Sequence, residues 1–225
     1  MRDLLSGAKP PQSTPAAFDP ASLAAFDGVV CGVDEVGRGP LAGPVVAAAV
    51  ILPPDHGIDG IGDSKTITKR KRNALYDAIT ESANIGIGYA NVAEIDALNI
   101  HQASLLAMQR AVFRLGAVPD LAVIDGRACP DLPCRAESVI KGDARVACIG
   151  AASIIAKVTR DRLMADLHRD YPAYGWDRNA GYGTREHCAA LDVWGATPHH
   201  RASFARVRAI LTGDAGPDRD PDGAR

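Results

Sequence analysis

The chain has 225 residues, of which 47% are hydrophobic and 23% charged, a length that suits one domain with a full core rather than two. Its formal net charge of −2 excludes a protein that binds nucleic acid through an overall basic excess, so any such binding must depend on local patches. No stretch approaches the ~18 apolar residues of a membrane span and the first residues lack a secretory signal, so we expect a cytoplasmic protein without membrane contact.

The first part of the domain is predicted to begin with strands. Val29–Val33 and Val45–Leu52 are β-branched apolar runs separated by a Gly- and Pro-rich turn, a pattern typical of a two-strand hairpin. Thr68 is suited to cap a helix that continues to about Ala83. A third strand is expected at Ile85–Val92. The hairpin and the third strand predict one sheet.

The second part alternates helices and strands. Apolar residues at helical spacing predict a helix over Ile100–Leu115, with Gly116 as its stop signal. Short strands are predicted at Leu121–Ile124 and Ser138–Ile140. The remaining predicted helices are Ala151–His168, Arg185–Trp194 and Ala202–Leu211.

The two ends of the chain differ from this central region. Residues 1–27 are rich in Ala, Pro and Ser, and residues 213–225 in Gly, Asp, Pro and Arg, without any sustained hydrophobic period. Such composition predicts a disordered leader and a disordered tail. We therefore expect the folded domain, including its C-terminal helices, to span residues 28–212.

A hairpin followed by alternating helices and strands is typical of a mixed sheet flanked by helices, so the predicted fold class is α/β. Asp34 directly follows the first apolar strand, and Asp125 follows the strand at Leu121–Ile124. Because ligands in open α/β sheets sit beyond the strand ends, two carboxylates are expected to meet at the rim of the sheet.

Cysteine and basic residues give weaker signals. Five cysteines, an odd number in a chain of this size, favour reduced thiols, and Cys129 and Cys134 lack a second pair at zinc-finger spacing. Basic residues gather in three places, and each alone is better explained as a solvated helix face than as a binding site. They are Lys69–Arg72, Lys157 with Arg160 and Arg162, and Arg201 with Arg206 and Arg208.

The segment that follows the first strand carries the most specific pattern. Asp34 and Glu35 alone could be an ordinary exposed strand end. They are followed, however, by Gly37-Arg38-Gly39, in which two glycines flank an arginine and leave backbone N–H groups open to an anion. A phosphate group is a suitable ligand for such a loop.

Over Gly32–Val50 the chain resembles the signature of bacterial type 2 ribonuclease H, the ribonuclease HII family. The resemblance recurs in the family's order and covers about residues 29–211. The further matching segments are Gly62-Asp63-Ser64-Lys65, Ile124-Asp125-Gly126, Lys141-Gly142-Asp143, Ala151–Asp161, Gly181-Tyr182-Gly183-Thr184, and His199-His200-Arg201 followed by Ser203-Phe204.

The resemblance implies a ribonuclease H-like mixed sheet with a C-terminal helical extension. It implies an endonuclease that hydrolyses the RNA strand of RNA/DNA hybrids and cuts duplex DNA 5′ of single ribonucleotides. We expect this endonuclease to be a monomer. The family's four acidic residues match Asp34, Glu35, Asp125 and Asp143. These carboxylates would be the catalytic residues and the ligands of Mn²⁺ or Mg²⁺, which prefer oxygen donors.

The resemblance also implies the substrate contacts. A 2′-hydroxyl is both donor and acceptor, and the backbone of Gly37, Arg38 and Gly39 is suited to read it. By resemblance, Tyr182 would stack on the sugar of the following deoxynucleotide, while Ser64 and Lys65 would contact phosphates. His187, His199 and His200 are interpreted as core or surface residues rather than catalytic ones.

Two alternatives remain open from the residues alone. The acidic cluster would also suit another metal-dependent nuclease or recombinase of the same architecture, although the Gly-Arg-Gly and Gly-Tyr-Gly-Thr elements disfavour it. A non-catalytic hybrid-binding protein would be expected to lack one of the acidic residues, and this sequence has all four.

Overall fold

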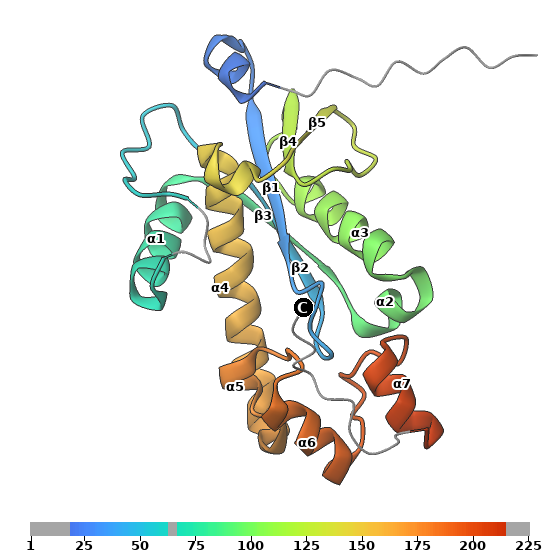
Figure 1. Ribbon diagram of the computed structural model, residues 1–225. Helices are drawn as coiled ribbons and strands as arrows, with labels where there is room; N and C mark the ends of the chain where they lie inside the picture. Colours follow the sequence, from blue (N-terminus) through green and yellow to red (C-terminus); the bar gives the residue numbers. More distant parts are fainter. Residues whose placement is uncertain (1–18, 63–66, 215–225) are drawn as a thin grey trace, which may run out of the picture.

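The computed structural model describes residues 19–62 and 67–214. A five-stranded mixed sheet of order β3-β2-β1-β4-β5 lies at its centre (Figure 1). Strands β1 to β3 pair antiparallel, whereas β4 and β5 extend the sheet in parallel from β1. The strands are β1 (Val30–Val36), β2 (Val45–Ile51), β3 (Asn84–Ala90), β4 (Leu121–Asp125) and β5 (Arg135–Val139). The predicted α/β class is confirmed.

Helices cover both faces of this sheet. In Figure 1, α3 lies on one side of the sheet and α4, with α1 beside it, on the other. The helices are α1 (Lys69–Ser82), α2 (Val92–Leu98), α3 (Ile100–Phe113), α4 (Ala147–Asp170), α5 (Trp176–Asn179), α6 (Arg185–Trp194) and α7 (Ala205–Thr212). Short 3-10 helices occur at Pro20–Ala25, Gly142–Ala144 and Pro172–Tyr174. None of the described helices is long and apolar enough to cross a membrane.

The alternation of side chains along β1 determines what each face of the strand meets. Val33 belongs to the buried cluster that packs against α3. Gly32 faces α4, because a β-carbon on it would lie 2.1 Å from the carbonyl carbon of Cys148. Only glycine permits this close approach of α4. With a period of two, Asp34 lies on the same face as Gly32 and therefore points toward α4.

The C-terminal helices form an extension at one end of α4, at the bottom of Figure 1. Their core contains Met164, Trp176 and Leu191, which pack with Ala42 from the turn between β1 and β2. This turn is hydrogen-bonded to the extension, because Leu41 N–H donates to the Gly181 carbonyl at 2.8 Å. The extension therefore fixes the position of the turn that follows β1.

Several boundaries differ from the sequence predictions. Strand β1 continues to Val36, so Asp34 lies within the strand rather than after it. Helix α4 begins at Ala147 instead of Ala151. Helix α1 starts as predicted, with the Thr68 side chain accepting from Lys71 N–H at 3.3 Å. Helix α2 and the short α5 were not predicted.

The predicted leader, residues 1–27, also requires a correction. Its last part forms the 3-10 helix Pro20–Ala25, which Asp19 caps by accepting from Ala21 N–H at 3.0 Å. Leu23 and Phe26 pack against the cluster of buried residues between β4 and α4. Apolar contact therefore fixes these residues despite their Ala- and Pro-rich surroundings. Residues 1–18 and 215–225 lie outside the described part of the chain.

Candidate active site

Asp34 and Asp125 lie side by side on neighbouring parallel strands. The register pairs Val33 of β1 with Ile124 of β4, and one aspartate follows directly on each strand. Asp34 is only 7% exposed and is hydrogen-bonded by the Ser153 side chain from α4. Burial raises the pKa of Asp34 well above its ordinary value, and the nearby charges of Glu35 and Asp125 raise it further.

Glu35 leaves the opposite face of β1 and joins the same electrostatic cluster. Burial raises the pKa of Glu35, and the charge of Asp125 adds to this effect. Arg38 opposes both, because its guanidinium donates to Glu35 Oε1 at 3.2 Å. The arginine of the Gly-Arg-Gly segment is therefore directly connected to one of the carboxylates, that of Glu35.

Asp143 lies in the short connection between β5 and α4, beside a residue that is bonded to this cluster. Lys141 adopts a left-handed conformation with φ of 55°, which turns the chain into the 3-10 helix Gly142–Ala144. Gly142 N–H then donates to Asp125 Oδ1 at 2.7 Å, so the residue next to Asp143 is fixed to the Asp125 side chain. Asp143 as a whole residue is 9% exposed.

Three of the four predicted acidic residues, Asp34, Glu35 and Asp125, thus gather at one rim of the sheet. Asp143 follows the residue whose N–H is bonded to Asp125. Over residues 19–62 and 67–214, no group of three or more His, Cys, Asp or Glu side chains is already arranged to hold a metal ion. Carboxylates that raise one another's pKa repel when ionised. Their donor set consists of oxygen atoms, which suits a hard divalent cation.

The loop between β1 and β2, residues 37–44, is held by two fully buried arginines. They are Arg160 of α4 and Arg201. Arg160 donates to three backbone carbonyls, those of Pro44 at 2.9 Å, Ala180 at 2.8 Å and Ala42 at 3.0 Å. Arg201 donates to the carbonyls of Gly37 at 2.5 Å, Arg38 at 2.9 Å and Gly43 at 2.8 and 3.0 Å. Six of these seven hydrogen bonds end on carbonyls of this loop, and the seventh, to Ala180, ends in the C-terminal extension.

Both arginines were expected among solvated basic patches, and this interpretation is wrong for them. Burial lowers the pKa of Arg160 to about 10, and burial together with the charge of Arg160 lowers that of Arg201 to about 9. Both remain charged at neutral pH, and neither forms an ion pair with another described residue. They place positive charge directly beneath the Gly-Arg-Gly segment, where an anion would bind.

Gly37 has to be glycine for two reasons. Its φ of 97° is a conformation that side chains rarely adopt, and a β-carbon would lie 2.2 Å from Arg160 Nε. Gly39 is different, because a β-carbon there would meet only the Tyr182 ring, at 3.5 Å. The predicted substrate residues Gly39 and Tyr182 are therefore neighbours in space. Tyr182 is 44% exposed, so its ring is available to a ligand.

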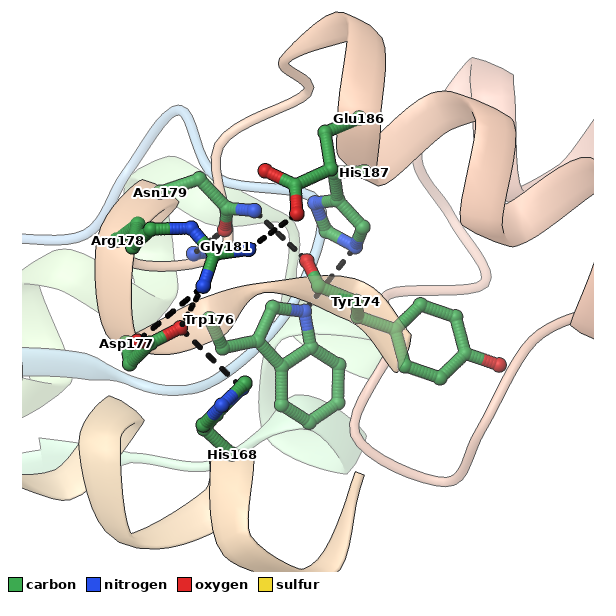
Figure 2. A network of polar contacts seen from close by, with 9 residues as sticks. All are labelled: His168, Tyr174, Trp176, Asp177, Arg178, Asn179, Gly181, Glu186 and His187. Carbon is green, nitrogen blue, oxygen red and sulfur yellow. Dashed lines mark hydrogen bonds and ion pairs between the residues drawn. The ribbon is translucent and has the colours of Figure 1, made fainter. Parts of the chain in front are cut away.

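A chain of neutral histidines supports the backbone of Tyr182. His200 Nδ1 accepts from Thr197 N–H at 2.9 Å, so its proton is on Nε2. His187 Nε2 accepts from Trp176 Nε1–H at 3.1 Å, as Figure 2 shows, and lies 3.0 Å from His200 Nε2. His187 therefore carries its proton on Nδ1 and donates to the Tyr182 carbonyl at 2.9 Å.

Burial keeps both of these rings uncharged. It lowers the pKa of His187 and, together with the neighbouring histidines, lowers the pKa of His200 to about 4. Figure 2 shows contacts of Asp177 with His168 and Arg178 in the same region. His187 and His200 are core residues, in agreement with the interpretation from sequence.

The remaining predicted contacts, Ser64 and Lys65, lie outside the described residues. The sequence interpretation missed Ser153, Arg160 and Arg201. One signal for Arg160 was present, since it follows Ala152 and Ala156 at the four-residue spacing of a buried helix face. No comparable periodicity marks Arg201, which lies outside a helix.

Comparison with known proteins identifies the family. The family model of ribonuclease HII matches residues 31–207. A ribonuclease HII of Ralstonia pickettii (strain 12J) is 57% identical over 189 residues, 82% of each chain. The ribonuclease H2 of Pyrococcus horikoshii OT3 superposes with a TM-score of 0.73 at 25% identity, over 82% of this chain and 97% of that one.

A more distant solved structure shares the fold alone. Bst-RNase HIII in complex with Mn²⁺ has a TM-score of 0.67 at 20% identity, over 94% of this chain and 79% of that one. The matched family region contains all four acidic residues, the Gly-Arg-Gly segment and Tyr182. This chain belongs to the ribonuclease HII family and is a ribonuclease H.

Proposed function

We propose that this ribonuclease H hydrolyses the RNA strand of RNA/DNA hybrids and cuts duplex DNA on the 5′ side of a single embedded ribonucleotide. The observation that carries the proposal is the contact between the Gly-Arg-Gly loop and Tyr182 beside the buried carboxylates. The loop can read a 2′-hydroxyl through its backbone groups, and the aromatic ring can test the next sugar. One site can thereby recognise a junction between RNA and DNA.

Divalent metal, Mn²⁺ or Mg²⁺, is the cofactor that the site fits. Asp34, Glu35, Asp125 and Asp143 would hold it, and a cation would favour the ionised forms that burial and mutual repulsion disfavour. A fold neighbour, Bst-RNase HIII, is known as a Mn²⁺ complex. When bound, a pair of such ions supplies an activated water and stabilises the leaving oxygen.

The residues of the chain itself bind and orient the substrate. Arg38 is half-exposed and bonded to Glu35, so its guanidinium can contact a phosphate without leaving the carboxylate cluster. Arg160 and Arg201 keep the loop in one conformation, which reduces the entropy lost on binding. Tyr182 offers a ring face to the sugar of the following deoxynucleotide.

The products should be a 3′-hydroxyl and a 5′-phosphate. Ribonucleases that use the 2′-hydroxyl as nucleophile need general acid and base groups with pKa values near neutrality. His187 and His200 are unsuited to this role, because both are buried, hydrogen-bonded and held neutral by a lowered pKa. In the proposed reaction the 2′-hydroxyl is read and a water attacks the phosphorus.

The direct test is a cleavage assay on a duplex with one ribonucleotide, beside the same duplex made entirely of DNA. Each is incubated with Mn²⁺, with Mg²⁺ and with chelator. We expect cleavage of the first duplex only, and only with metal. Cleavage of the all-DNA duplex at a rate similar to that of the ribonucleotide duplex would contradict the proposal. An Asp34→Asn variant as active as the wild type would contradict it as well.

A further inference from the structure

We propose that a basic hollow between α1, α4 and α5 binds the phosphodiester backbone of the nucleic-acid substrate several nucleotides from the cleaved bond. The inference rests on the proposed function, which supplies a polyanionic substrate. The hollow contains none of the four carboxylates of the candidate active site. Its basic lining residues are Lys69, Arg72, Lys157, Arg162 and Arg178.

The hollow is positively charged although the whole chain is not. Its lining has the five basic side chains against two acidic ones, Asp161 and Asp177, a local charge of +3, whereas the formal net charge of the chain is −2. Basic groups from two of the sequence clusters, Lys69–Arg72 and Lys157 with Arg162, meet here. Nucleic-acid binding by a protein without a basic excess requires this kind of concentration.

The acidic residues leave part of the lining unneutralised. Arg178 is paired with Asp177 and with Glu186, which lies outside the lining. Asp161 Oδ1 accepts from Lys157 Nζ at 2.7 Å, and its other oxygen lies 3.8 Å from Arg72 Nη1, so one carboxylate is shared by two cations. Lys69 and Arg162 are exposed and form no ion pair with any described residue. Two positive charges are therefore available to an incoming anion.

Arg162 is also held in a fixed position. Its guanidinium carbon lies 4.4 Å from the centre of the Tyr76 ring on α1, a cation–π contact between the two helices. A planar guanidinium that is already oriented loses less conformational entropy when it binds a phosphate. Asn73, also on α1, adds a neutral hydrogen-bonding group to the lining.

The position of the hollow along α4 gives the distance from the cleaved bond. Ser153 on α4 is the hydrogen-bond partner of Asp34. Along the helix axis, Lys157 lies about 6 Å beyond Ser153, and Ala165 lies about 18 Å beyond Ser153. Successive phosphates of one strand advance by about 3.4 Å along a duplex. For a strand that runs alongside α4, these distances correspond to phosphates roughly two to five nucleotides from the site of cleavage. Figure 1 shows α1 alongside α4 and α5 near its end.

The test compares two double variants that remove the same net charge. Lys69→Gln with Arg162→Gln removes the two unpaired charges of the hollow. Arg135→Gln with Arg169→Gln removes two exposed charges outside it, one of them also on α4. Binding of a duplex of about 30 base pairs with one central ribonucleotide is measured in chelator from 50 to 200 mM salt, and cleavage is measured in Mn²⁺.

We expect the hollow variant to reduce the slope of log affinity against log salt by about 2, since each lost phosphate contact removes about 0.9. The affinity ratio of wild type to variant should then be about tenfold larger at 50 mM than at 200 mM salt. The control variant should keep the wild-type slope. Melting temperatures near that of the wild type would show that both variants fold.

Truncated substrates test on which side of the ribonucleotide the hollow contacts the duplex. Shortening the duplex to about two base pairs on one side of the ribonucleotide should abolish the difference between hollow variant and wild type, and shortening the other side should not. Equal slopes for both variants, or a difference that survives truncation on either side, would overturn the inference. Wild-type cleavage of the ribonucleotide substrate in the same experiment would leave the proposed function standing, and its absence would overturn that function instead.

Discussion

The ring of Tyr182 lies against Gly39, so that a β-carbon on Gly39 would be 3.5 Å from Tyr182 Cε1. If the ring face tests the sugar, Tyr182→Ala should lower kcat/KM on a single-ribonucleotide duplex by about 5- to 150-fold, the equivalent of about 1 to 3 kcal/mol of stacking. Tyr182→Phe should stay near the wild type. Equal defects in the two variants would assign the effect to the hydroxyl instead.

The two glycines of the Gly-Arg-Gly segment should respond differently to alanine. Gly37→Ala combines a left-handed φ with a clash against Arg160 Nε, and should destabilise the protein by about 1 to 3 kcal/mol. Gly39→Ala should keep the melting temperature but lower kcat/KM, because its methyl group occupies space facing Tyr182. Thermal unfolding and steady-state kinetics on both variants check this. Loss of stability in Gly39→Ala would show that the loop tolerates no side chain at either position.

Arg201 should be essential for stability because four hydrogen bonds to the loop depend on it. Arg201→Met leaves buried carbonyls without donors and should cost at least about 3 kcal/mol in denaturant unfolding. Arg208→Met, at an exposed position on α7, is the matched control and should change stability by about 0.5 kcal/mol or less. If both variants unfold at the same denaturant concentration, the Arg201 contacts do not hold the loop.

Asp34 should reduce the stability of the metal-free protein at neutral pH. Its pKa is raised in the folded state, chiefly by burial, so the folded protein favours the protonated form. The stabilising contribution is present at low pH and is lost as pH rises through the folded-state pKa. Asp34→Asn should therefore melt above the wild type in chelator at pH 8, with a difference that shrinks toward pH 4, while its cleavage activity is lost.

Manganese provides the complementary measurement. A cation that binds the carboxylates should raise the melting temperature of the wild type more than that of Asp34→Asn, since binding to the folded state adds stability. A wild type that melts higher than the variant in chelator throughout this pH range would contradict the account of Asp34.

The sequence alone predicts those parts of the site that follow from the pattern of the strands. Asp34 and Asp125 each come at the end of an apolar run, and parallel neighbours bring such positions together at one rim. The contact between Gly39 and Tyr182 was accessible only through the family resemblance, because no local pattern relates the two segments. Helix α2 was missed although its capping box, Asn91 with Glu94, is legible in the sequence.

Other features depend on tertiary contacts that a sequence pattern does not contain. Arg160 and Arg201 look like members of basic clusters, and only the packing of the extension against the β1–β2 loop reveals that both are buried. The 3-10 helix Pro20–Ala25 is stabilised by Leu23 and Phe26 against the core, not by its own composition. Intrinsic propensity is a weak guide where packing decides the conformation.

The central claim, metal-dependent hydrolysis with a 2′-hydroxyl that is read and not consumed, is tested most directly by mass analysis of the cleaved strand. A duplex with one ribonucleotide is digested in Mn²⁺, beside chelator and beside Asp143→Asn, for which we expect a normal fold and a loss of several orders of magnitude in turnover. The account predicts a 3′-hydroxyl on the DNA fragment and a 5′-phosphate on the ribonucleotide, with no product in chelator. A 2′,3′-cyclic phosphate, or cleavage that continues in excess chelator, would contradict it.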